Sequence, residues 1–340
     1  MHSLKCGEGD YIKDNNKIIF DVKGFIHPPN RIVAFPRFIP DSHGDRELDG
    51  TSYKKIYPLL ERYKFLEERL PRYLIFDPVF GMNLCEVPKK DIQAIYRPSN
   101  RLRELRTSSQ LDEMEKKALS LIEYIQNISN IPWDKLGISG SLLVRLHTPK
   151  SDIDPVVYGE KNCFKLHATL RSAMNNEKSE VKRHTEEELR ALCYYRSQDT
   201  TMPSDLFIKT ESRKVLQGRF GQREFYIRCI KSLNETVQEY GDYNYQRVGY
   251  AKISATVLDD SEAIFTPCRY PIDNVKLLEG AHGTAVKEIV SFRGRFCEQA
   301  REGESVIAQG KVEKVQGKIK TPIFRLILGG QASDFMVLER

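Results

Sequence analysis

The chain has 340 residues, of which 40% are hydrophobic and 29% are charged, with a formal net charge of +6. This length favours two or three domains, because single cores stop growing well below it, and the composition is typical of a globular protein. No stretch approaches the roughly 20 apolar residues needed to cross a bilayer. The first residues, "MHSLKCGEGDYIKDNNKIIF", show no secretory signal. We therefore expect a cytoplasmic protein without a membrane partner.

The seven cysteines are widely scattered along the chain. They form no Cys-x-x-Cys pair, and no Cys and His residues stand at metal-ligand spacing. We expect free thiols in a reducing compartment rather than a disulfide framework or a zinc site.

Residues 1–104 combine short β-like runs, such as "RIVAFPRFI", with one helical pattern, "SYKKIYPLLERYKFLEERL". Apolar residues recur in that pattern at helical spacing, so this segment is predicted to be a small α+β domain. Residues 105–235 begin with a helix at 111–129, for which Ser108 or Ser109 is the predicted cap. Further helices and strands follow, and they predict a second domain with a mixed sheet.

Residues 236–340 change to a nearly all-β pattern, as in "YAKISATVLD", "EIVSFRGRF" and "IFRLILGG", with turn residues between the runs. Short strands with this spacing are typical of a small barrel or sandwich. The chain as a whole is therefore predicted to be α+β, with a barrel-like domain at its C-terminal end.

The sharpest local pattern is "GISGSLLVRLHTPKSDIDPVVYG", residues 137–159. Asp152 and Asp154 stand one residue apart, so on a strand their side chains point the same way, about 7 Å apart. Carboxylates this close repel each other unless a cation lies between them. Hard oxygen ligands favour Mg²⁺ or Mn²⁺, whose remaining coordination positions are filled by water and substrate phosphates. Gly140 lets a backbone approach a phosphate, and Ser141 offers a hydroxyl and an amide at a helix start. Asp-x-Asp alone also occurs in solvated turns. The prediction of a metal and phosphate site therefore depends on the combination of Asp-x-Asp with the Gly-Ser element.

This segment resembles the signature of the polymerase β-like nucleotidyltransferase superfamily, a Gly-Ser element followed by Asp-x-Asp on the next strand. The whole chain also resembles an archaeal group of predicted nucleotidyltransferases, with a front domain containing "IHPPNRIVAFPRFIP" and a β-rich tail. The resemblance implies that Asp152 and Asp154 ligate catalytic metals, and that Gly140 and Ser141 bind nucleotide phosphates. It also implies a mixed sheet with helices for residues 105–235.

The superfamily's third carboxylate lies on a later strand, for which "REFYIRCIK" is the candidate. Tyr226 stands where the acid is expected, and Glu224 shares its face of the predicted strand. The third acid is therefore either displaced to Glu224 or absent, and its absence would weaken metal binding and leave the general base unassigned. Pro155, next to the motif, removes a strand amide and predicts an edge or bulged strand.

Basic residues near the motif are candidates for phosphate binding. Arg145 and Lys150 flank it, and Arg228 follows the candidate third-acid position. Long basic side chains on turns are also commonly just solvated. The segment 209–231 contains seven basic residues but only two acids. Such an excess of positive charge suits binding of a polyanion such as RNA or DNA. A solvent-exposed helix face is an equal alternative.

These patterns predict a metal-dependent nucleotidyltransferase that moves a nucleoside monophosphate from a nucleoside triphosphate to a hydroxyl acceptor and releases pyrophosphate. The predicted catalytic acids are Asp152, Asp154 and Glu224. The alternative is a nucleotide- or RNA-binding protein that has lost turnover, for which Tyr226 is the main support.

Overall fold

The structure is a computed structural model that describes residues 5–197, 202–236, 238–318 and 321–339. Helices and strands are mixed throughout, so the protein is α+β, as predicted. The chain divides into two compact units. The first takes in most of the predicted segments 1–104 and 105–235. The second takes in 238–340 with two shorter pieces, 76–83 and 183–214.

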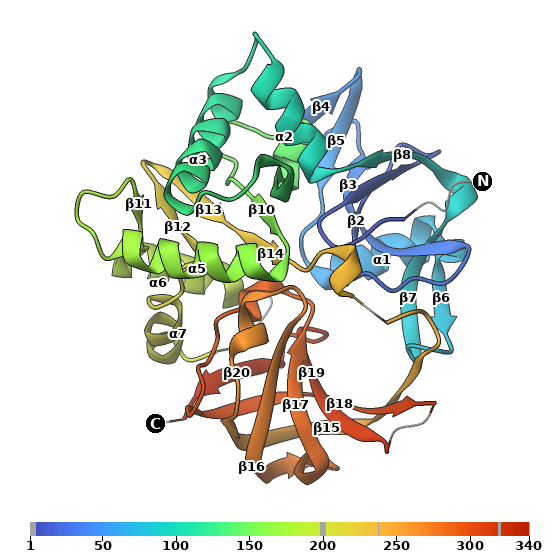
Figure 1. The fold of residues 1–340 in the computed structure, drawn as a ribbon. Coiled ribbons are helices and arrows are strands. Elements are labelled where there is room, and N and C mark those ends of the chain that lie inside the picture. Colours follow the sequence, from blue (N-terminus) through green and yellow to red (C-terminus); the bar gives the residue numbers. More distant parts are fainter. Residues whose placement is uncertain (1–4, 198–201, 237, 319–320, 340) are drawn as a thin grey trace. The chain divides into compact units, whose positions relative to one another are not determined.

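An N-terminal sheet of eight strands, drawn in blue to cyan in Figure 1, belongs mainly to the first unit, while residues 76–83 at the end of β6 and the start of β7 count with the second. Six strands follow the order β4-β5-β3-β2-β1-β8, while β7 pairs with both β3 and β6. The helix α1 (Leu59–Arg69) lies between β5 and β6 in the chain. The strands are β1 (Tyr11–Asp14), β2 (Ile19–Val22), β3 (Arg31–Pro40), β4 (Arg46–Leu48), β5 (Thr51–Lys55), β6 (Leu74–Asp77), β7 (Met82–Pro88) and β8 (Ile92–Tyr96).

A three-stranded core sheet, β14-β10-β9, forms the second part of the first unit. The central strand β10 pairs antiparallel with β9 and parallel with β14. Helix α5 contacts β10 and β14 and also α3, whereas α2 contacts β9 (Figure 1). The elements are α2 (Pro98–Thr107), α3 (Glu113–Ser129), β9 (Leu136–Ile138), α4 (Gly140–Leu143), β10 (Pro155–Tyr158), α5 (Glu160–Met174) and β14 (Arg228–Ile230).

One local prediction in this region is wrong, and another is wrong in one of its two alternatives. Helix α3 is capped by Asp112, which accepts hydrogen bonds from the amides of Met114 and Glu115 in a capping box, and not by Ser108 or Ser109. The strand β10 is central rather than an edge strand. Pro155 is tolerated there because it is the first residue of the strand, where a missing N–H costs least.

The predicted strand "REFYIRCIK" is divided between two sheets. Its first half is β13 (Arg223–Tyr226), which joins a small sheet with β12 (Gln217–Phe220) and β11 (Val181–Lys182). Its second half is β14, which joins the core sheet. The break falls at Ile227, whose amide donates instead to the carbonyl of Leu216.

The part of the second unit that the structure describes contains the helices α6 and α7 and a six-stranded curled sheet of order β15-β16-β17-β19-β18-β20. The strand β15 also pairs with β18, so five of the strands close into a ring around a buried apolar core. All pairings within this sheet are antiparallel except that of β17 with β19. The elements are α6 (Glu186–Ser197), α7 (Ser204–Glu211), β15 (Tyr243–Val257), β16 (Cys268–Gly280), β17 (Val286–Ser291), β18 (Ser305–Gly317), β19 (Ile323–Leu328) and β20 (Phe335–Leu338).

The N-terminal sheet and the core sheet share one apolar cluster. Phe38 on β3 and Tyr53 on β5 pack with Leu143, Val144 and Leu146, which belong to α4 and the loop after it. Burial of large side chains such as these contributes about 1.5–3 kcal/mol each. This packing brings the N-terminal sheet next to the Gly-Ser element of the core.

Candidate functional site

The two aspartates lie on the segment that leads into β10. An isolated parallel bridge joins Ile153 to Phe225, and the amide of Ile153 donates to the carbonyl of Glu224. Because neighbours across a bridge point to the same face and the next residues to the other, Asp152 and Asp154 share a face. On the opposite side of the segment, the amide of Ser139 donates to the carbonyl of Asp154 at 2.8 Å. The Asp-x-Asp element is thus held between two backbone neighbours.

Gly140 lies directly against the carboxylate of Asp154. Its φ of +65° favours glycine, and a Cβ added there would stand 1.9 Å from Asp154 Oδ2. The preceding residue is also fixed, because the Ser139 hydroxyl donates to the Gly9 carbonyl at 3.1 Å. The Gly-Ser element and the Asp-x-Asp element, predicted from sequence to act together, are in van der Waals contact at this glycine.

Asp154 is partly buried, and its surroundings disfavour its charge. Burial and the neighbouring charge of Asp152 raise the pKa of Asp154 to about 6, against the opposing effects of Arg228, Lys55 and Arg37. Within the described residues, neither aspartate carboxylate accepts a hydrogen bond or forms an ion pair of 4.0 Å or less. The charged form of Asp154 is therefore disfavoured by its surroundings, and no hydrogen bond or close ion pair from a described residue offsets this effect.

The register across the Ile153–Phe225 bridge places two residues beside the aspartates. Tyr226 stands next to Asp154 and Glu224 next to Asp152, on the same face. The side chains of Asp152 and Glu224 are exposed. Among the residues that the structure describes, no third acid joins the two aspartates with ligand atoms within 4.8 Å. A role for Glu224 therefore stays a prediction.

Ser141 has a structural contact of its own. Its buried hydroxyl donates to Ser151 Oγ at 3.2 Å, and that oxygen also accepts the Thr148 amide at 2.9 Å. This pair of bonds ties the loop before Asp152 to α4. Of the two polar groups of Ser141 that could bind a phosphate, the hydroxyl is therefore already used inside the protein, and the proposed phosphate contact is the backbone amide.

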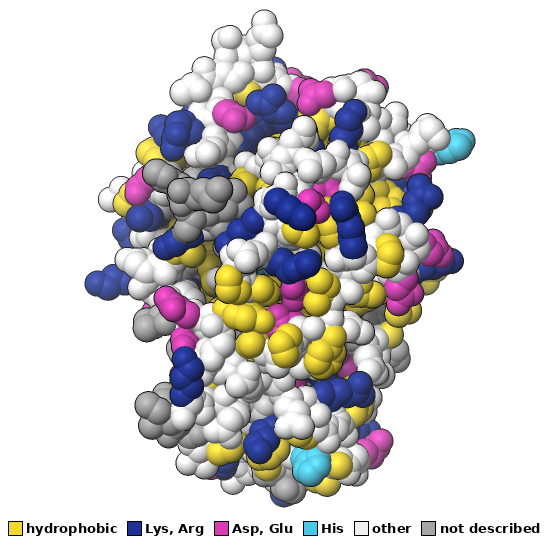
Figure 2. All heavy atoms as spheres, turned by 90° about the vertical axis from the view of Figure 1, so that its right-hand side faces the viewer, with side chains coloured by type: hydrophobic (Ala, Val, Ile, Leu, Met, Phe, Trp, Pro, Cys, Tyr) yellow, Lys and Arg dark blue, Asp and Glu magenta, His cyan; other side chains and the backbone are white. Residues whose placement is uncertain are grey.

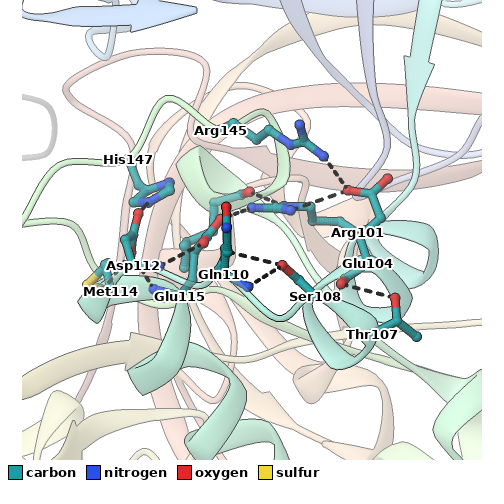
Figure 3. A network of polar contacts seen from close by, with 11 residues as sticks. Arg101, Glu104, Thr107, Ser108, Gln110, Asp112, Met114, Glu115, Arg145 and His147 are labelled. Atoms are coloured by element: carbon teal, nitrogen blue, oxygen red, sulfur yellow. Dashed lines mark hydrogen bonds and ion pairs between the residues drawn. The ribbon is translucent and has the colours of Figure 1, made fainter.

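The flanking basic residues differ in their surroundings. The side chain of Arg145 is exposed and pairs with Glu104 at 3.0 Å, as Figure 3 shows. Lys150 is exposed on the turn. Arg228 is largely buried, donates to Glu8 at 3.1 Å and acts electrostatically on Asp154. Of these three, Arg228 is the one that the structure places in the electrostatic field of the aspartates.

Two cations near the aspartates were missed by sequence reasoning. Arg37 on β3 and Lys55 on β5 both act electrostatically on Asp154, and Lys55 also acts on Asp152. Burial and the charge of Arg37 lower the pKa of Lys55. The only sequence signal was a basic residue inside an otherwise apolar run, "RIVAFPRFI", and a single such residue is too common to interpret.

The basic segment 209–231 is mostly neutralised by the fold. At least four of its seven basic residues pair with acids within 4.0 Å. The pairs are Arg213 with Glu304, Lys214 with Glu211, Arg228 with Glu8 and Lys231 with Glu160. On the face shown in Figure 2, Lys and Arg side chains are interspersed with acidic and apolar ones. The segment thus offers less free positive charge than its composition suggests.

A second group of potential metal ligands lies at the start of α3. Ligand atoms of Asp112, Glu115 and His147 lie within 4.8 Å of one another, and His147 Nε2 contacts Asp112 Oδ2 at 2.7 Å (Figure 3). The oxygens already have partners, because Asp112 caps the helix and Glu115 pairs with Arg101. Burial alone would raise the pKa of Asp112, but the Glu115 amide and His147 lower it. We interpret this group as a helix cap.

All seven cysteines are free thiols, as the sequence predicts, and six of them are buried. No helix in the described ranges is long and apolar enough to span a membrane.

Comparison with known proteins identifies the family of the chain. It is 31% identical over 345 residues to the uncharacterized protein MJ1086 of Methanocaldococcus jannaschii, and the match covers 98% of each chain. The chain therefore belongs to the same family as this archaeal protein. No family model matches the chain. No solved structure matches it either.

Proposed function

We propose that the protein is a metal-dependent nucleotidyltransferase, which transfers a nucleoside monophosphate from a nucleoside triphosphate to a hydroxyl acceptor. The main support for this proposal is the contact of Gly140 with the carboxylate of Asp154, because it brings the Gly-Ser element and the Asp-x-Asp element together. The order of the core sheet, β14-β10-β9, also supports the nucleotidyltransferase-like fold inferred from sequence.

The aspartates suit a divalent cation. Asp152 and Asp154 present oxygen ligands from one strand face, and no described side chain neutralises them by an ion pair. Oxygen ligands of this kind favour Mg²⁺ or Mn²⁺. When bound, such a metal neutralises phosphate charge and lowers the pKa of a coordinated oxygen.

The residues have separate tasks in the proposed reaction. The hydroxyl oxygen of the acceptor forms a bond to the α-phosphorus, and the bond from that phosphorus to the β-phosphate oxygen breaks. Pyrophosphate leaves with the electron pair of the broken bond. The hydroxyl proton passes to a carboxylate, for which Glu224, beside Asp152, is the candidate base. Gly140 and the amide of Ser141 face the phosphates, and Arg228 adds positive charge behind Asp154.

A second candidate function is a nucleotide-binding protein without turnover. Its support is Tyr226, which stands beside Asp154 in the register position that an acid would need to complete the metal site. This protein would bind nucleoside triphosphates with a metal but transfer nothing. An RNA-binding role has less support, because most of segment 209–231 is paired internally.

Transfer of label separates these functions. The protein is incubated with each α-labelled nucleoside triphosphate, Mg²⁺ or Mn²⁺, and pools of short RNA and DNA strands. We expect label transfer by the natural protein and loss of at least about 100-fold in Asp152→Asn/Asp154→Asn, because charge-assisted contacts to the metal are removed.

The control is Asp134→Asn/Glu68→Gln, which removes two negative charges from exposed side chains that are 73% and 59% accessible. This double variant should keep full activity. Metal-dependent nucleotide binding without transfer to any acceptor would favour the binding protein. Equal transfer by both double variants would exclude the assigned site.

A further inference from the structure

We propose that Arg37 and Lys55, both carried by the N-terminal sheet, bind the phosphates of the nucleoside triphosphate whose metal is held by Asp152 and Asp154. This inference rests on the proposed function and extends it, because it makes the N-terminal sheet a wall of the active site.

The packing of the N-terminal sheet accounts for the position of Lys55. Lys55 pairs with Phe38 across β5 and β3, and paired residues point to the same face of a sheet. That face is the one that packs on Leu143 and Val144 of the core. Lys55 is thereby directed toward the core element that carries Gly140, and the charges of Asp152 and Asp154 act on its ammonium group.

A β-bulge accounts for the position of Arg37. Between β2 and β3 the pairing passes from Ile19↔Phe38 to Phe20↔Pro36, so Arg37 is an extra residue on β3. Bulges of this kind redirect a side chain and are frequent next to active sites. The guanidinium lies over the ring of Tyr57, 4.7 Å from its centroid, and this stacking supports the planar group.

Arg37, Lys55, Asp152 and Asp154 form what we call the open cluster. They are two cations and two anions whose fields act on one another. Within the part of the chain that the structure describes, no two of them approach within 4.0 Å as an ion pair. Opposite charges at a partly buried site attract strongly, so the fold holds them apart. A metal bound to a polyphosphate presents positive charge to the aspartates and negative charge to Arg37 and Lys55 at once.

Asp21 on β2 supports the charge of Arg37. Its side chain is 5% exposed and pairs with Lys23 at 2.7 Å, while its second oxygen, Oδ1, has no hydrogen-bond partner among the described residues. Burial works against the charge of Arg37, but Tyr11 and Asp21 raise the pKa of this side chain. The guanidinium of Arg37 is thus kept charged without forming a close ion pair to any described residue.

The test measures metal binding and phosphate binding separately by calorimetry. The probes are Mg²⁺ alone, inorganic tripolyphosphate with Mg²⁺, and each nucleoside triphosphate with Mg²⁺. The variants are Arg37→Gln and Lys55→Gln. Lys54→Gln is the matched control, since Lys54 is the exposed neighbour on β5 and pairs with Glu61. We expect each of the first two to weaken binding of Mg²⁺·tripolyphosphate by about 10- to 100-fold, while Mg²⁺ alone binds as well or better. Lys54→Gln should match the natural protein.

The charge-keeping variants Lys55→Arg and Arg37→Lys guard against loss of folding. Lys55→Arg should bind Mg²⁺·tripolyphosphate within about 5-fold of the natural protein, a difference of about 1 kcal/mol. Arg37→Lys keeps the charge but loses the planar group over Tyr57, so its loss of affinity should be smaller than that of Arg37→Gln. Losses as large as in the glutamine variants would overturn the role of charge. Unchanged binding in Arg37→Gln and Lys55→Gln, with nucleotide binding still dependent on Asp154, would overturn this inference and leave the proposed function standing. If the natural protein binds no polyphosphate and no nucleoside triphosphate with metal, the proposed function fails, and this inference fails with it.

Discussion

Two groups of charged side chains in this protein are treated in opposite ways by the fold. In the second unit, Lys214, Glu211 and Arg196 form a closed cluster. Lys214 pairs with Glu211 at 2.6 Å and Arg196 pairs with the same acid at 2.8 Å. In the first unit, the open cluster holds the same kinds of charge without any ion pair among its members.

The difference between the closed and the open cluster indicates which charged side chains are available to bind a ligand. In the closed cluster, Lys214 also donates to the carbonyl of Arg295 and to Gln299 Oε1, so its donors are used inside the protein. A buried charge with all its partners is part of the fold. In the open cluster, burial and the charge of Asp152 raise the pKa of Asp154 to about 6, so the fold carries an electrostatic cost there. Perturbed titratable groups of this kind are enriched at functional sites.

The largest predicted effect tests the closed cluster. The change Lys214→Met should lower the free energy of unfolding by about 3 kcal/mol, the lower end of the range for breaking a buried pair, because Arg196 still pairs with Glu211. Urea denaturation measures this loss. The exposed neighbour Lys209 provides the control, and Lys209→Met should cost less than about 0.5 kcal/mol. Equal effects at the two lysines would remove the contrast between paired and free basic residues in this segment.

The next prediction concerns the loss of stability caused by the charged form of Asp154. Its pKa is raised from 3.8 to about 6 in the folded state, so the protonated acid favours the fold. That contribution is present below pH 3.8 and is lost as the pH rises through 6. A pKa difference of about two corresponds to about 3 kcal/mol. Asp154→Asn should therefore gain stability relative to the natural protein by about that amount between pH 4 and pH 8.

Thermal melts of both proteins across this pH range check the sign. Asp134→Asn, at an exposed acid, should show no such pH-dependent gain. Mg²⁺ should raise the melting temperature of the natural protein at pH 8 and leave that of Asp154→Asn unchanged. A stability difference that does not vary with pH would mean that Asp154 carries no charge penalty.

The smallest predicted effect on stability comes from Gly140→Ala. The left-handed backbone costs an alanine about 1 kcal/mol, and its Cβ would displace the Asp154 carboxylate, which lies 1.9 Å from the Cβ position. We expect a modest loss of stability but a loss of metal-dependent nucleotide affinity of at least about 10-fold. Gly221→Ala is the control, since it has a similar φ of +59° with open space around its Cβ. Equal affinities in the two variants would show that the contact with Asp154 does not matter.

The sequence predicted the local chemistry of the core better than its surroundings. The α+β class, the Gly140 turn and the strand after Asp154 follow from patterns within a few residues, because backbone restrictions and strand periodicity act locally. The break of "REFYIRCIK" at Ile227 does not follow, since it depends on its amide donating to the carbonyl of Leu216, just before the neighbouring strand β12. The exact cap of α3 was also missed, because several polar residues near the start compete for that role.

The contribution of the N-terminal sheet was beyond the reach of sequence patterns. Arg37 and Lys55 act electrostatically on Asp154, and their positions depend on a bulge in β3 and on the packing of Phe38 on the core. Neither relation has a local sequence signature. The reverse holds for Arg145 and Lys150, which are close to the motif in sequence yet lie exposed, with Arg145 paired to Glu104. Sequence proximity to a motif is thus a poor guide to the cations around it.

The most direct measurement is Mn²⁺ binding, followed by electron paramagnetic resonance in the presence of tripolyphosphate. The proposed site predicts that bound Mn²⁺ disappears in Asp152→Asn/Asp154→Asn, that it weakens as the pH falls below about 6, where Asp154 takes up a proton, and that it survives in His147→Gln. Mn²⁺ that stays bound in the double variant and is lost in His147→Gln would contradict this site and place the metal at Asp112 and Glu115 instead.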